Sequence, residues 1–300
     1  MESVNYYAGL ALDRATDRRR DAAWVASRLE HPQARIVPMW QLKALIVAAE
    51  TPEPVFLSAQ ESGAAESFSV FLGEDHGVPY FALELSHLDA ADIGRRFGGR
   101  GRFVDLRAVG PRIDRRHGGL LAYARGLMYW HSRHRFCGVC GSPTRIEAAG
   151  HLRVCTNQAC NAEHFPRTDP AVIMLVTHGE SCLLARQRQW PRGQHSTLAG
   201  FVEPGESLED AVRREVREET AVALTGVRYH SSQPWPFPAS IMLGFTATAV
   251  SLDFRIDPGE LEGGAWFTRD FLRRPHDPEV FHLPRPDSIA RRLIEDWVND

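Results

Sequence analysis

Long apolar runs, an excess of basic charge and repeated segments are all missing from this sequence of 300 residues. No apolar run approaches the roughly 18 residues that a helix needs to cross a bilayer, so we expect no membrane partner. The formal net charge of −3 argues against the broad basic surface with which many proteins bind nucleic acid. The N-terminal residues lack a basic segment followed by an apolar one, and we therefore expect no secretory signal peptide.

Cysteine is also scarce, with five in the whole chain, and four of these fall into two close pairs. This pattern favours a metal site in a reducing compartment over a framework of disulfides, so we expect a cytoplasmic protein. Hydrophobic residues make up 43% of the chain and charged residues 24%, as in ordinary soluble globular proteins. The length indicates about two domains, with room for a small insert.

The first part of the chain has the pattern of short strands with one or two helices. Strands are expected at residues 35–40 and 54–60, and residues 67–85 are expected to form a hairpin that turns at residues 74–77. A helix is expected over residues 21–29. A longer one is expected over residues 117–133, where apolar residues recur at helical spacing.

A second set of strands begins after Pro170. The expected strands before and after a charged helix that starts near Leu208 are residues 171–177, 181–187, 197–203, 227–232 and 240–250. The last segment, residues 287–298, has the pattern of an amphipathic helix with Ser288 as its N-cap.

Four cysteines are spaced as ligands of a single metal ion. Cys137 and Cys140 form C-x2-C, Cys155 and Cys160 form C-x4-C, and 14 residues separate the two pairs. Two such knuckles suit a tetrahedral zinc ion on a small ribbon. Because all four positions are thiolates, the zinc is expected to be structural, with one ion per chain. The alternative is four buried thiols without metal.

Two glycines accompany these cysteines, and one cysteine stands apart from them. Gly138 and Gly141 are expected to form the tight turn that lets two thiolates face one ion. Cys182 is alone in a predicted strand and is assigned to the core. Zinc ribbons often contact nucleic acid, so this segment also leaves open a nucleic-acid-binding protein.

The segment REVREET, residues 214–220, lies in the charged helix and contains three glutamates. Ser207 and Asp210 form an expected capping box at the start of this helix. The apolar stripe that begins at Leu208 continues through Glu215 and Glu219, where a core-facing helix carries apolar residues. These two like charges lie four residues apart, and no cation stands three or four residues from either.

Two interpretations of this helix are possible. In a solvated face the charges pair four residues apart, as Glu209 does with Arg213, and as Asp210 and Glu218 do with Arg214. That interpretation leaves Glu215 and Glu219 unexplained. A divalent cation between these two carboxylates converts their repulsion into binding. The glycine-containing turn at residues 200–206, just before the helix N-terminus, favours phosphate.

Residues 200–222 as a whole resemble the Nudix box, G-x5-E-x7-R-E-U-x-E-E-x-G-U, in which U is aliphatic. The matching positions are Gly200, Glu206, Arg214, Glu215, Val216, Glu218, Glu219 and Val222. Ala221 stands where the family has glycine, near the helix end, where a positive φ costs alanine about 1 kcal/mol.

The resemblance implies an α/β (α+β) fold, a Nudix α/β/α sandwich that hydrolyses nucleoside diphosphates linked to another group. The implied ligands of a catalytic Mg²⁺ or Mn²⁺ are Glu215, Glu219 and the Ala199 carbonyl. Glu218 is implied as a further ligand or as the base that deprotonates water. Partners that orient the helix are implied to be Glu206 and Arg214.

The segment SQPWPFPAS, residues 232–240, places Trp235 and Phe237 among three prolines. Stiff aromatic faces beside a phosphate site suit the stacking of a nucleobase or a nicotinamide ring. The alternative is a loop whose aromatic side chains fill the core. At every fixed position the segment is similar to the SQPWPFPxS signature of the NADH pyrophosphatase family.

This second resemblance implies three domains: an N-terminal Nudix-like α/β domain (1–130), an intervening four-cysteine zinc ribbon (131–167) and a catalytic Nudix domain (168–300). The implied substrate-binding residues are Gln233, Pro234, Trp235, Pro236, Phe237, Pro238, Ala239, Ser240, Phe165, Ala290 and Arg107. At Phe165 relatives often have tyrosine, and Arg107 is also open to interpretation as a surface arginine. Glu260 is implied as a further metal ligand, with a surface acid as its alternative.

The expected activity is therefore metal-dependent hydrolysis of NADH or NAD⁺ to AMP and nicotinamide mononucleotide. The resemblance also implies NAD-capped RNA as a second substrate and a homodimer as the assembly. One alternative is a Nudix hydrolase for ADP-ribose or another nucleoside diphosphate. An alternative of another class is a zinc-ribbon regulator that binds nucleic acid and has an inactive Nudix domain.

Overall fold

The computed structural model describes residues 4–47, 49–63 and 68–300, which divide into two compact units. The N-terminal unit contains Tyr7–Thr168 and, from far along the chain, Pro236–Ala239. The C-terminal unit contains residues 4–6, Asp169–Trp235 and Ser240–Asp300. Within this described part, no helix is long and apolar enough to cross a membrane.

The C-terminal unit is a mixed sheet between helices. Its elements, in chain order, are β10 (Asp169–His178), β11 (Ser181–Arg186), β12 (Leu198–Phe201), α6 (Leu208–Thr220), β13 (Leu224–Trp235), β14 (Ser240–Ala249), β15 (Gly263–Thr268), α7 (Arg269–Leu272) and α8 (Ile289–Asn299). The strand order is β13-β14-β10-β11-β15, and β12 pairs with β10. β10 and β14 run parallel to each other, whereas the other pairs are antiparallel.

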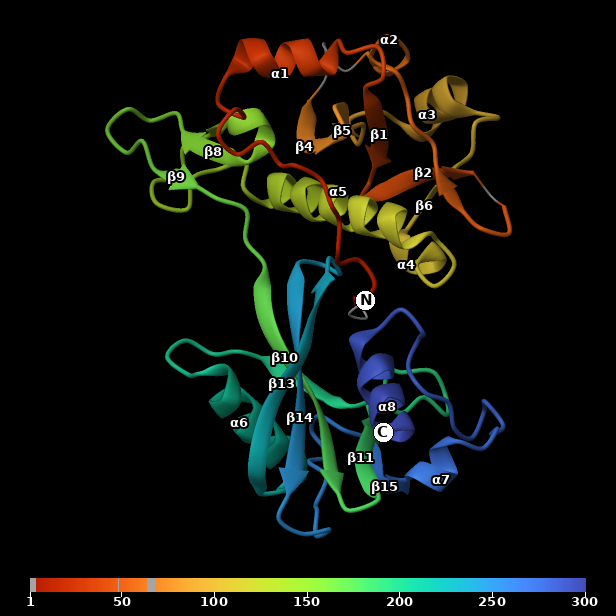
Figure 1. Cartoon of the computed structure of the whole chain (residues 1–300). Coiled ribbons are helices and arrows are strands. Elements are labelled where there is room, and N and C mark those ends of the chain that lie inside the picture. The colour runs from red at the N-terminus through yellow and green to blue at the C-terminus, as the bar shows by residue number, and fades with distance from the viewer. Residues whose placement is uncertain (1–3, 48, 64–67) are drawn as a thin grey trace. The chain divides into compact units, whose positions relative to one another are not determined.

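Strand β10 shows why this unit has two cores. Val172 and Met174 face the core that includes residues of α6, whereas Ile173 and Leu175 face the core that includes residues of α8. Successive side chains of a strand point to opposite faces, so a strand covered on both faces is apolar throughout. Figure 1 shows the two helices on opposite sides of the sheet. The predicted α/β/α sandwich is confirmed.

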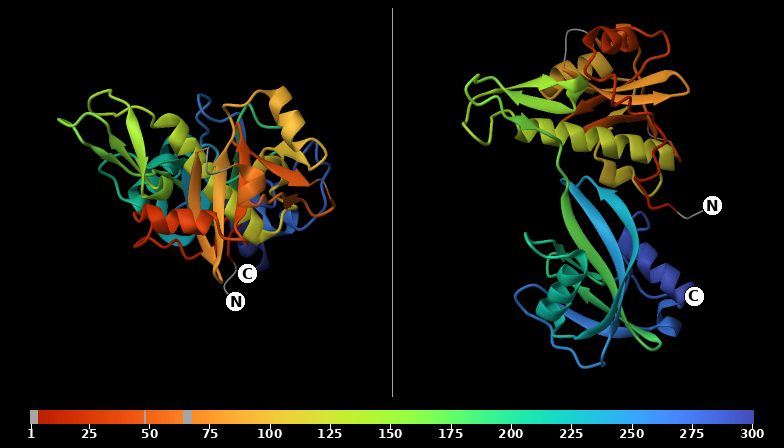
Figure 2. Two further views of the ribbon diagram at one scale, coloured as in Figure 1. Left: turned by 90° about the horizontal axis from the view of Figure 1, so that it is seen from above. Right: turned by 60° about the vertical axis from the view of Figure 1, so that its left-hand side comes forward.

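The N-terminal unit contains a second mixed sheet and a small ribbon. Its elements are α1 (Ala22–Leu29), β1 (Arg35–Trp40), β2 (Lys43–Val47), β3 (Glu53–Pro54), α2 (Ala59–Ser62), β4 (Ser69–Asp75), β5 (Val78–Glu84), α3 (Ala90–Phe97), β6 (Arg102–Val104), α4 (Leu106–Val109), α5 (Arg115–Arg133), β7 (Thr144–Glu147), the 3-10 turn η2 (Ala148–Gly150), β8 (Leu152–Cys155) and β9 (Glu163–His164). The two views in Figure 2 show α5 and α1 on opposite faces of the larger sheet.

The two larger sheets share the arrangement of four strands. In the N-terminal unit the order β4-β5-β1-β2 repeats the order β13-β14-β10-β11, with the central pair parallel in each case. The sequence shows no internal repeat, so this similarity is one of topology. The described residues between β2 and β4 form β3 and the four-residue helix α2, whereas the corresponding connection in the C-terminal unit contains α6.

Two strand predictions differ from the structure. Residues 54–60 form a strand only at their start, because Ser58 caps α2 in a capping box with Glu61 and turns the chain into a helix. Strand β13 extends to Trp235, three residues beyond its predicted end. The hairpin of β4 and β5, the helix α5 and the N-caps at Ser207 and Ser288 are confirmed. Ser67, at the predicted start of the hairpin, lies outside the described residues.

Ala221 follows α6 in a left-handed conformation, with φ at 57°. Glycine adopts this conformation without the steric cost that a Cβ atom introduces. We expect Ala221→Gly to stabilise the protein by about 1 kcal/mol, or roughly 2–4 °C in Tm, as measured by calorimetry. Ala223→Gly is the matched control, because Ala223 has an ordinary negative φ, and this change should lower Tm. Equal effects of the two substitutions contradict the conformation at Ala221.

Candidate active site and zinc ribbon

Helix α6 presents acidic side chains on its buried face. Its apolar residues Ala211, Val212 and Val216 are fully buried in the core beneath the sheet. Glu215 and Glu219 continue this face and are also buried, with 9% and 3% of their surfaces exposed. The predicted continuation of the apolar stripe through two carboxylates is therefore present in the folded protein.

Three carboxylates converge at this face of α6. Glu215, Glu219 and Glu260 each place an oxygen within 4.8 Å of the others. Oε2 of Glu219 is buried and has no hydrogen-bond partner among the described residues. A buried oxygen without a donor is destabilising, and a cation is the group that can satisfy three carboxylates at once. The cluster therefore fits a divalent metal ion such as Mg²⁺ or Mn²⁺.

Gly200 makes room for this cluster. It lies on strand β12, and a Cβ atom added there meets the Glu215 carboxyl carbon at 1.9 Å. Atoms cannot approach so closely without bonding, so any side chain at this position displaces the carboxylate. The glycine of the box is therefore required by contact with Glu215.

The electrostatics of the cluster favour a cation as well. Burial raises the pKa of the Glu219 carboxyl to about 8, and the charges of Glu215 and Glu260 add to this effect. Burial also raises the pKa of Glu215, against the opposing influence of Arg214. Metal-free protein thus holds carboxylates that resist ionisation, whereas a bound cation favours their charged form.

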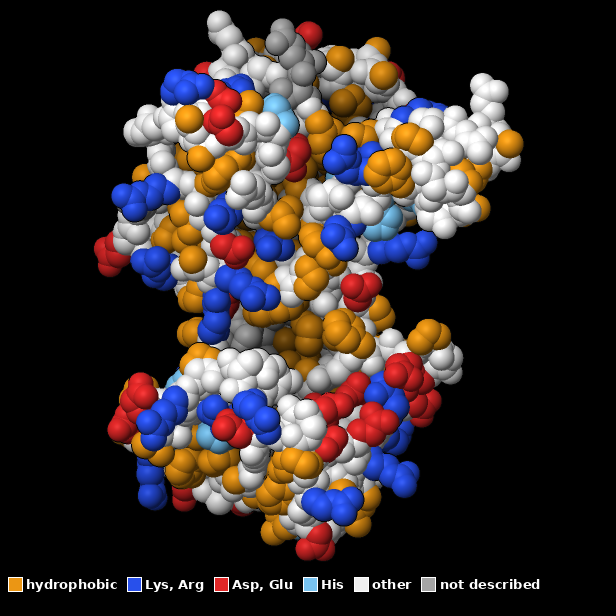
Figure 3. Space-filling view, turned by 180° about the vertical axis from the view of Figure 1, so that it is seen from behind, with side chains coloured by type: hydrophobic (Ala, Val, Ile, Leu, Met, Phe, Trp, Pro, Cys, Tyr) orange, Lys and Arg blue, Asp and Glu red, His pale blue; other side chains and the backbone are white. Residues whose placement is uncertain are grey.

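Arg214 connects the acidic residues around the start of α6. Its guanidinium donates to both carboxylate oxygens of Glu206, at 3.0 and 2.7 Å, and to the Phe201 carbonyl at 2.9 Å. It also donates to Glu215 at 2.9 Å and Glu218 at 3.0 Å. Figure 3 shows acidic side chains gathered beside basic ones where α6 reaches the surface. Arg214 therefore fixes the loop before α6 to the acidic face of the helix.

Two ion pairs expected within α6 do not form. Arg213 donates to the backbone carbonyl of Glu209 and lies 3.9 Å from the Asp210 carboxylate, so the expected pair of Glu209 and Arg213 is absent. Asp210 completes the capping box with Ser207 instead of pairing with Arg214, which turns toward Glu206. The hydrogen bonds from Arg214 hold the pKa of Glu206 at about 2, so this carboxylate remains charged. The expected pair of Arg214 and Glu218 is present.

A cavity of about 310 Å³ in the C-terminal unit reaches the acidic cluster at Glu219. It brings together Ala199, Glu219, Gln233, Trp235 and Ala290, all of which the sequence analysis selected. The residues that complete its lining without having been selected are Ile173, Ala185, Gln187, Trp190, Gln194, Ser196, Thr197, Leu198, Met242, Leu261, Pro284, Arg285, Ser288 and Ile289. Among these residues, Trp190 could have been selected from the sequence, because it is an aromatic residue in a polar loop shortly before the box.

Gln233 lines this cavity but uses its amide group within the fold. Its nitrogen donates to the carbonyls of Tyr6 and Asp287, and its oxygen accepts from the Ile289 backbone at 2.8 Å. The last of these bonds satisfies an N–H group at the start of α8, the helix that also contains Ala290. The side chain of Gln233 thus positions α8 relative to β13.

Residues 4–6 also belong to the C-terminal unit, which the sequence did not reveal. Asn5 donates to the Ser231 hydroxyl and the Ser232 carbonyl, and accepts from Arg292. These partners lie more than 220 residues away along the chain, so no local pattern predicts the contacts.

The tip of the hairpin between β13 and β14 packs within the N-terminal unit. Phe237 is 7% exposed, and its ring contacts the edge of Tyr7. The guanidinium carbons of Arg107 and Arg125 lie 4.7 and 4.9 Å from the centre of that ring. Arg107 donates to the Phe237 carbonyl at 3.3 Å, and Arg125 donates to the Pro236 carbonyl. The two arginines thus hold the aromatic ring by cation–π contacts and its backbone by hydrogen bonds.

These contacts separate the members of the signature segment. Trp235 lines the cavity, whereas Phe237 is buried among residues of the N-terminal unit. Phe165, the other aromatic residue selected from the sequence, is 52% exposed in that same unit. The alternative considered for these aromatic residues is that their side chains fill the core. It describes the surroundings of Phe237 better than those of Trp235.

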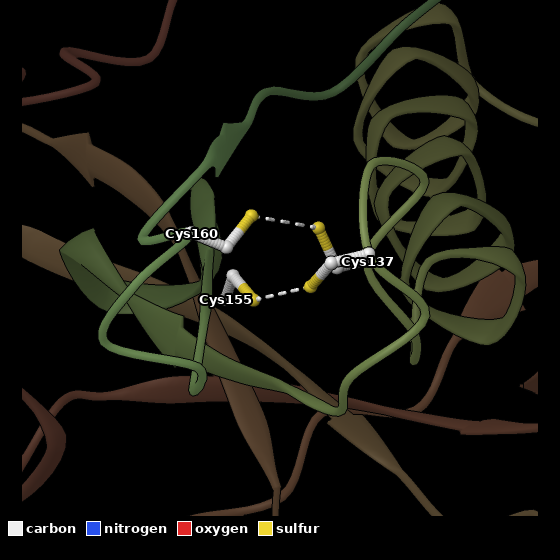
Figure 4. Close-up of side chains that lie close together, drawn as sticks. Cys137, Cys155 and Cys160 are labelled. Carbon is white, nitrogen blue, oxygen red and sulfur yellow. Dashed lines mark hydrogen bonds between the residues drawn. The ribbon is translucent and has the colours of Figure 1, made fainter.

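The four paired cysteines converge as their spacing predicted. Their Sγ atoms all lie within 4.8 Å of one another, and Figure 4 shows those of Cys137, Cys155 and Cys160 turned toward a common centre. Strand β8 ends at Cys155, which pairs with Thr144 of β7, and β9 places Nε2 of His164 at 3.3 Å from the Cys137 sulfur. Four sulfur donors at this separation fit a tetrahedral zinc ion.

Of the two glycines expected in the knuckle turn, only Gly141 adopts a positive φ, at 75°. The other, Gly138, has an ordinary backbone conformation because the turn needs a single left-handed residue. Cys182 is fully buried in β11, so its assignment to the core is confirmed.

Comparison with known proteins gives three adjoining domain matches. Residues 33–130 match the NADH pyrophosphatase-like rudimentary NUDIX domain, and residues 132–165 match the NADH pyrophosphatase zinc ribbon domain. Residues 167–284 match the NUDIX domain.

Several known proteins are similar to this chain over much of its length. The NAD-capped RNA hydrolase NUDT12 of Macaca fascicularis is 34% identical over 99% of this chain and 74% of its own length. The NAD-capped RNA hydrolase NudC of Stutzerimonas stutzeri is 44% identical over 75% of each chain. The mitochondrial NAD(P)H pyrophosphatase NUDT13 of Homo sapiens is 37% identical over 66% of this chain and 60% of its own length.

The buried carboxyl of Glu219 predicts a pH-dependent stability of the metal-free protein. Its pKa of about 8 lies above the ordinary value of 4.5, so its contribution is favourable below pH 4.5 and is lost as the pH rises through 8. Glu219→Gln cannot ionise. In EDTA we expect its Tm to exceed that of the wild type by several degrees at pH 8, and by little at pH 5.

Calorimetry between pH 5 and pH 8 provides the measurement. Glu209→Gln, an exposed position on the same helix, is the matched control and should show no such divergence. Millimolar Mg²⁺ should stabilise the wild type in preference to Glu219→Gln, because binding to the native state adds to its stability. Parallel pH profiles for wild type and Glu219→Gln in EDTA contradict the assignment.

The cysteine cluster predicts about one zinc ion per chain in protein purified without chelators. Cys137→Ser should lower the zinc content and the Tm together, because metal binding contributes to folding. Cys182→Ala is the control: it removes a buried cysteine outside the ribbon, and should lower Tm while leaving zinc unchanged. Elemental analysis gives the metal content, and zinc-free wild-type protein contradicts the prediction.

Proposed function

The chain belongs to the NADH pyrophosphatase family within the Nudix superfamily, and we propose that it hydrolyses NADH or NAD⁺ to AMP and nicotinamide mononucleotide. One observation carries this proposal. A cavity lined by Trp235 and Glu219 reaches the carboxylate cluster of Glu215, Glu219 and Glu260, of which the first two are buried. An aromatic wall beside a cation site suits a substrate that joins a flat ring to a pyrophosphate.

The acidic residues are proposed to have two roles, binding of the cation and acceptance of a proton. Glu215, Glu219 and Glu260 are the residues that would hold the cation, together with the Ala199 carbonyl. A divalent cation, when bound, offsets the negative charge of the pyrophosphate and makes water more acidic. Glu218 is half exposed and is held by Arg214 at 3.0 Å. We assign it the role of accepting a proton from the attacking water, or of a further ligand.

The reaction adds one water molecule across the pyrophosphate. The water oxygen bonds to one phosphorus atom, and the bond from that atom to the bridging oxygen breaks. The water supplies the hydroxyl group on one product phosphate, while its second proton passes to the carboxylate base and then to solvent. Arg214 and Glu206 keep α6 and the preceding loop in register during this step, because their two parallel hydrogen bonds resist rotation.

Substrate recognition is assigned to residues 233–240 and to three positions outside them. Trp235 offers a ring face to the nicotinamide or adenine, and Ala290 contributes the wall formed by α8. Gln233 supports these contacts because its side chain joins β13 to the start of α8. Arg107, which contacts Phe237, and the exposed Phe165 complete the proposed set. We also propose that the N-terminal domain ends at residue 130 and the zinc ribbon at residue 167.

NAD-capped RNA is a proposed second substrate. Two similar proteins are named as NAD-capped RNA hydrolases, and the reacting pyrophosphate is the same in the free dinucleotide and in the cap. We further propose a homodimer, on the basis of the family resemblance, and a cytoplasmic location. The five cysteines, none of which is in a disulfide, support a reducing compartment.

The test is the release of AMP and nicotinamide mononucleotide from NADH, followed by chromatography. Cleavage is expected with Mg²⁺ or Mn²⁺ and should stop in EDTA, and Glu219→Gln should lower kcat by orders of magnitude. Preference for ADP-ribose supports the rival Nudix substrate, and an inactive wild type that binds RNA supports the regulator.

A further arm of the experiment separates recognition from chemistry. Loss of a stacking face typically costs about 1–3 kcal/mol, so Trp235→Ala should lower kcat/KM for NADH roughly ten- to a hundredfold. Trp266→Phe is the control, because Trp266 packs against the core and does not line the cavity. Equal losses in both variants, with lowered Tm, indicate that Trp235 has a structural role alone.

A further inference from the structure

The cavity contains a buried hydroxyl for which the fold provides no partner. Oγ1 of Thr197 is buried and makes no hydrogen bond within the described part of the chain. Oε2 of Glu219 has the same property, and both residues line the same cavity. The cation site accounts for Glu219. Thr197 is not among the residues assigned to the cation site, which are Glu215, Glu219, Glu260 and the Ala199 carbonyl, so its unpaired hydroxyl needs another explanation.

The contrast with Gln233, another polar residue of the lining, is informative. Gln233 uses both its amide nitrogen and its amide oxygen inside the fold. Buried polar groups are almost always paired, and an exception at a cavity wall points to a partner supplied by a ligand. A threonine hydroxyl can turn toward the cavity by rotation about one bond, and it then both donates and accepts.

The walls around Thr197 define what such a ligand is. Trp190 and Trp235 are aromatic, and the apolar members of the lining are Ile173, Ala185, Leu198, Ala199, Met242, Leu261, Pro284, Ile289 and Ala290. The lining also contains Ser196 and Ser288, and the Ser288 hydroxyl donates to the Arg285 carbonyl. Apolar and aromatic walls of this kind accept a flat ring, and a hydroxyl among them can bond one polar edge of that ring. Dinucleotides of nicotinamide carry two such edges: the nicotinamide carboxamide and the exocyclic amine of adenine.

We propose that Thr197 is a specificity-determining residue whose hydroxyl hydrogen-bonds the amide or amine edge of the ring that enters the cavity. The inference rests on the proposed function, since it requires a dinucleotide substrate. Because the proposed bond is made to the ring and not to the phosphate groups that react, we expect it to contribute equally in the ground state and the transition state. It therefore acts on KM and leaves kcat nearly unchanged.

The variants Thr197→Val and Thr197→Ser separate the hydroxyl from the shape of the side chain. Thr197→Val should raise KM for NADH about three- to tenfold with little change in kcat, as expected for loss of one neutral hydrogen bond. Thr197→Ser keeps the hydroxyl and should remain within about twofold of the wild type in KM. Thr177→Val is the control, because its hydroxyl bonds the Ala247 carbonyl and it does not line the cavity.

The Tm of the ligand-free protein is a second measurement. If the Thr197 hydroxyl had a structural role, Thr197→Val would lower this Tm. Replacing an unpaired buried hydroxyl by a methyl group should keep or raise the Tm of the ligand-free protein in Thr197→Val. The control Thr177→Val should lower Tm, because it breaks an existing bond. A rise in KM without a loss of Tm is therefore the signature of a hydroxyl that serves a ligand.

Two single-ring ligands identify which edge is read. Binding of AMP and of nicotinamide mononucleotide to the wild type and to Thr197→Val is measured by calorimetry without divalent metal. Weakened binding of AMP alone assigns the adenine amine, and weakened binding of nicotinamide mononucleotide alone assigns the carboxamide. Either result supports the proposal, and unchanged binding of both overturns it.

The kinetic outcomes distinguish this inference from the proposed function. If the wild type cleaves NADH and Thr197→Val has an unchanged KM, the role of Thr197 is wrong and the function stands. If the wild type fails to cleave NADH, the proposed function is wrong, and the role assigned to Thr197 in reading a dinucleotide is overturned with it.

Discussion

The burial of two carboxylates on one face of α6 is the constraint on which the rest of the site depends. Glu215 and Glu219 occupy positions where a core-facing helix carries apolar side chains, and Glu260 brings a third negative group to them. Without a cation this arrangement is unfavourable, as the raised pKa of Glu219 shows. Strand β12 approaches the helix closely enough to enclose the carboxylates only because Gly200 has no side chain. Sheet, helix and glycine together thus create a site that a divalent ion completes.

Arg214 keeps this repulsive arrangement in place. It binds Glu206 on the loop, the Phe201 carbonyl at the end of β12, and Glu215 and Glu218 on the helix. The parallel bonds to Glu206 fix the guanidinium plane, so one side chain sets the position of the helix relative to the strand. The cavity above the cluster is formed by other elements, which Gln233 ties together by joining β13 to the start of α8. The proposed cation site and the proposed ring site therefore depend on separate hydrogen-bond networks.

The N-terminal unit repeats the sheet of the catalytic unit without its acidic helix. The order β4-β5-β1-β2 matches β13-β14-β10-β11, yet the described residues of the connection after β2 form β3 and α2, where the catalytic unit has α6. A helix of four residues cannot present two glutamates four positions apart on one face. The unit instead encloses the hairpin tip, where Arg107 and Arg125 contact Phe237. The same topology therefore supports a metal site in one unit and a packing role in the other.

The sequence by itself determined the features that depend on spacing along the chain. The four cysteines, the carboxylates of α6, the caps at Ser207 and Ser288 and the apolar strand β10 all follow from residue types at short spacings along the chain. What it left open were contacts between distant segments. The tertiary structure decided that Arg214 donates to Glu206 and that Asn5 donates to Ser231. It also decided which residues line the cavity: Trp235 and Thr197, with its unpaired hydroxyl, do so, whereas Phe237 does not. Such contacts depend on which surfaces the fold brings together, and local periodicity carries no information about partners hundreds of residues away.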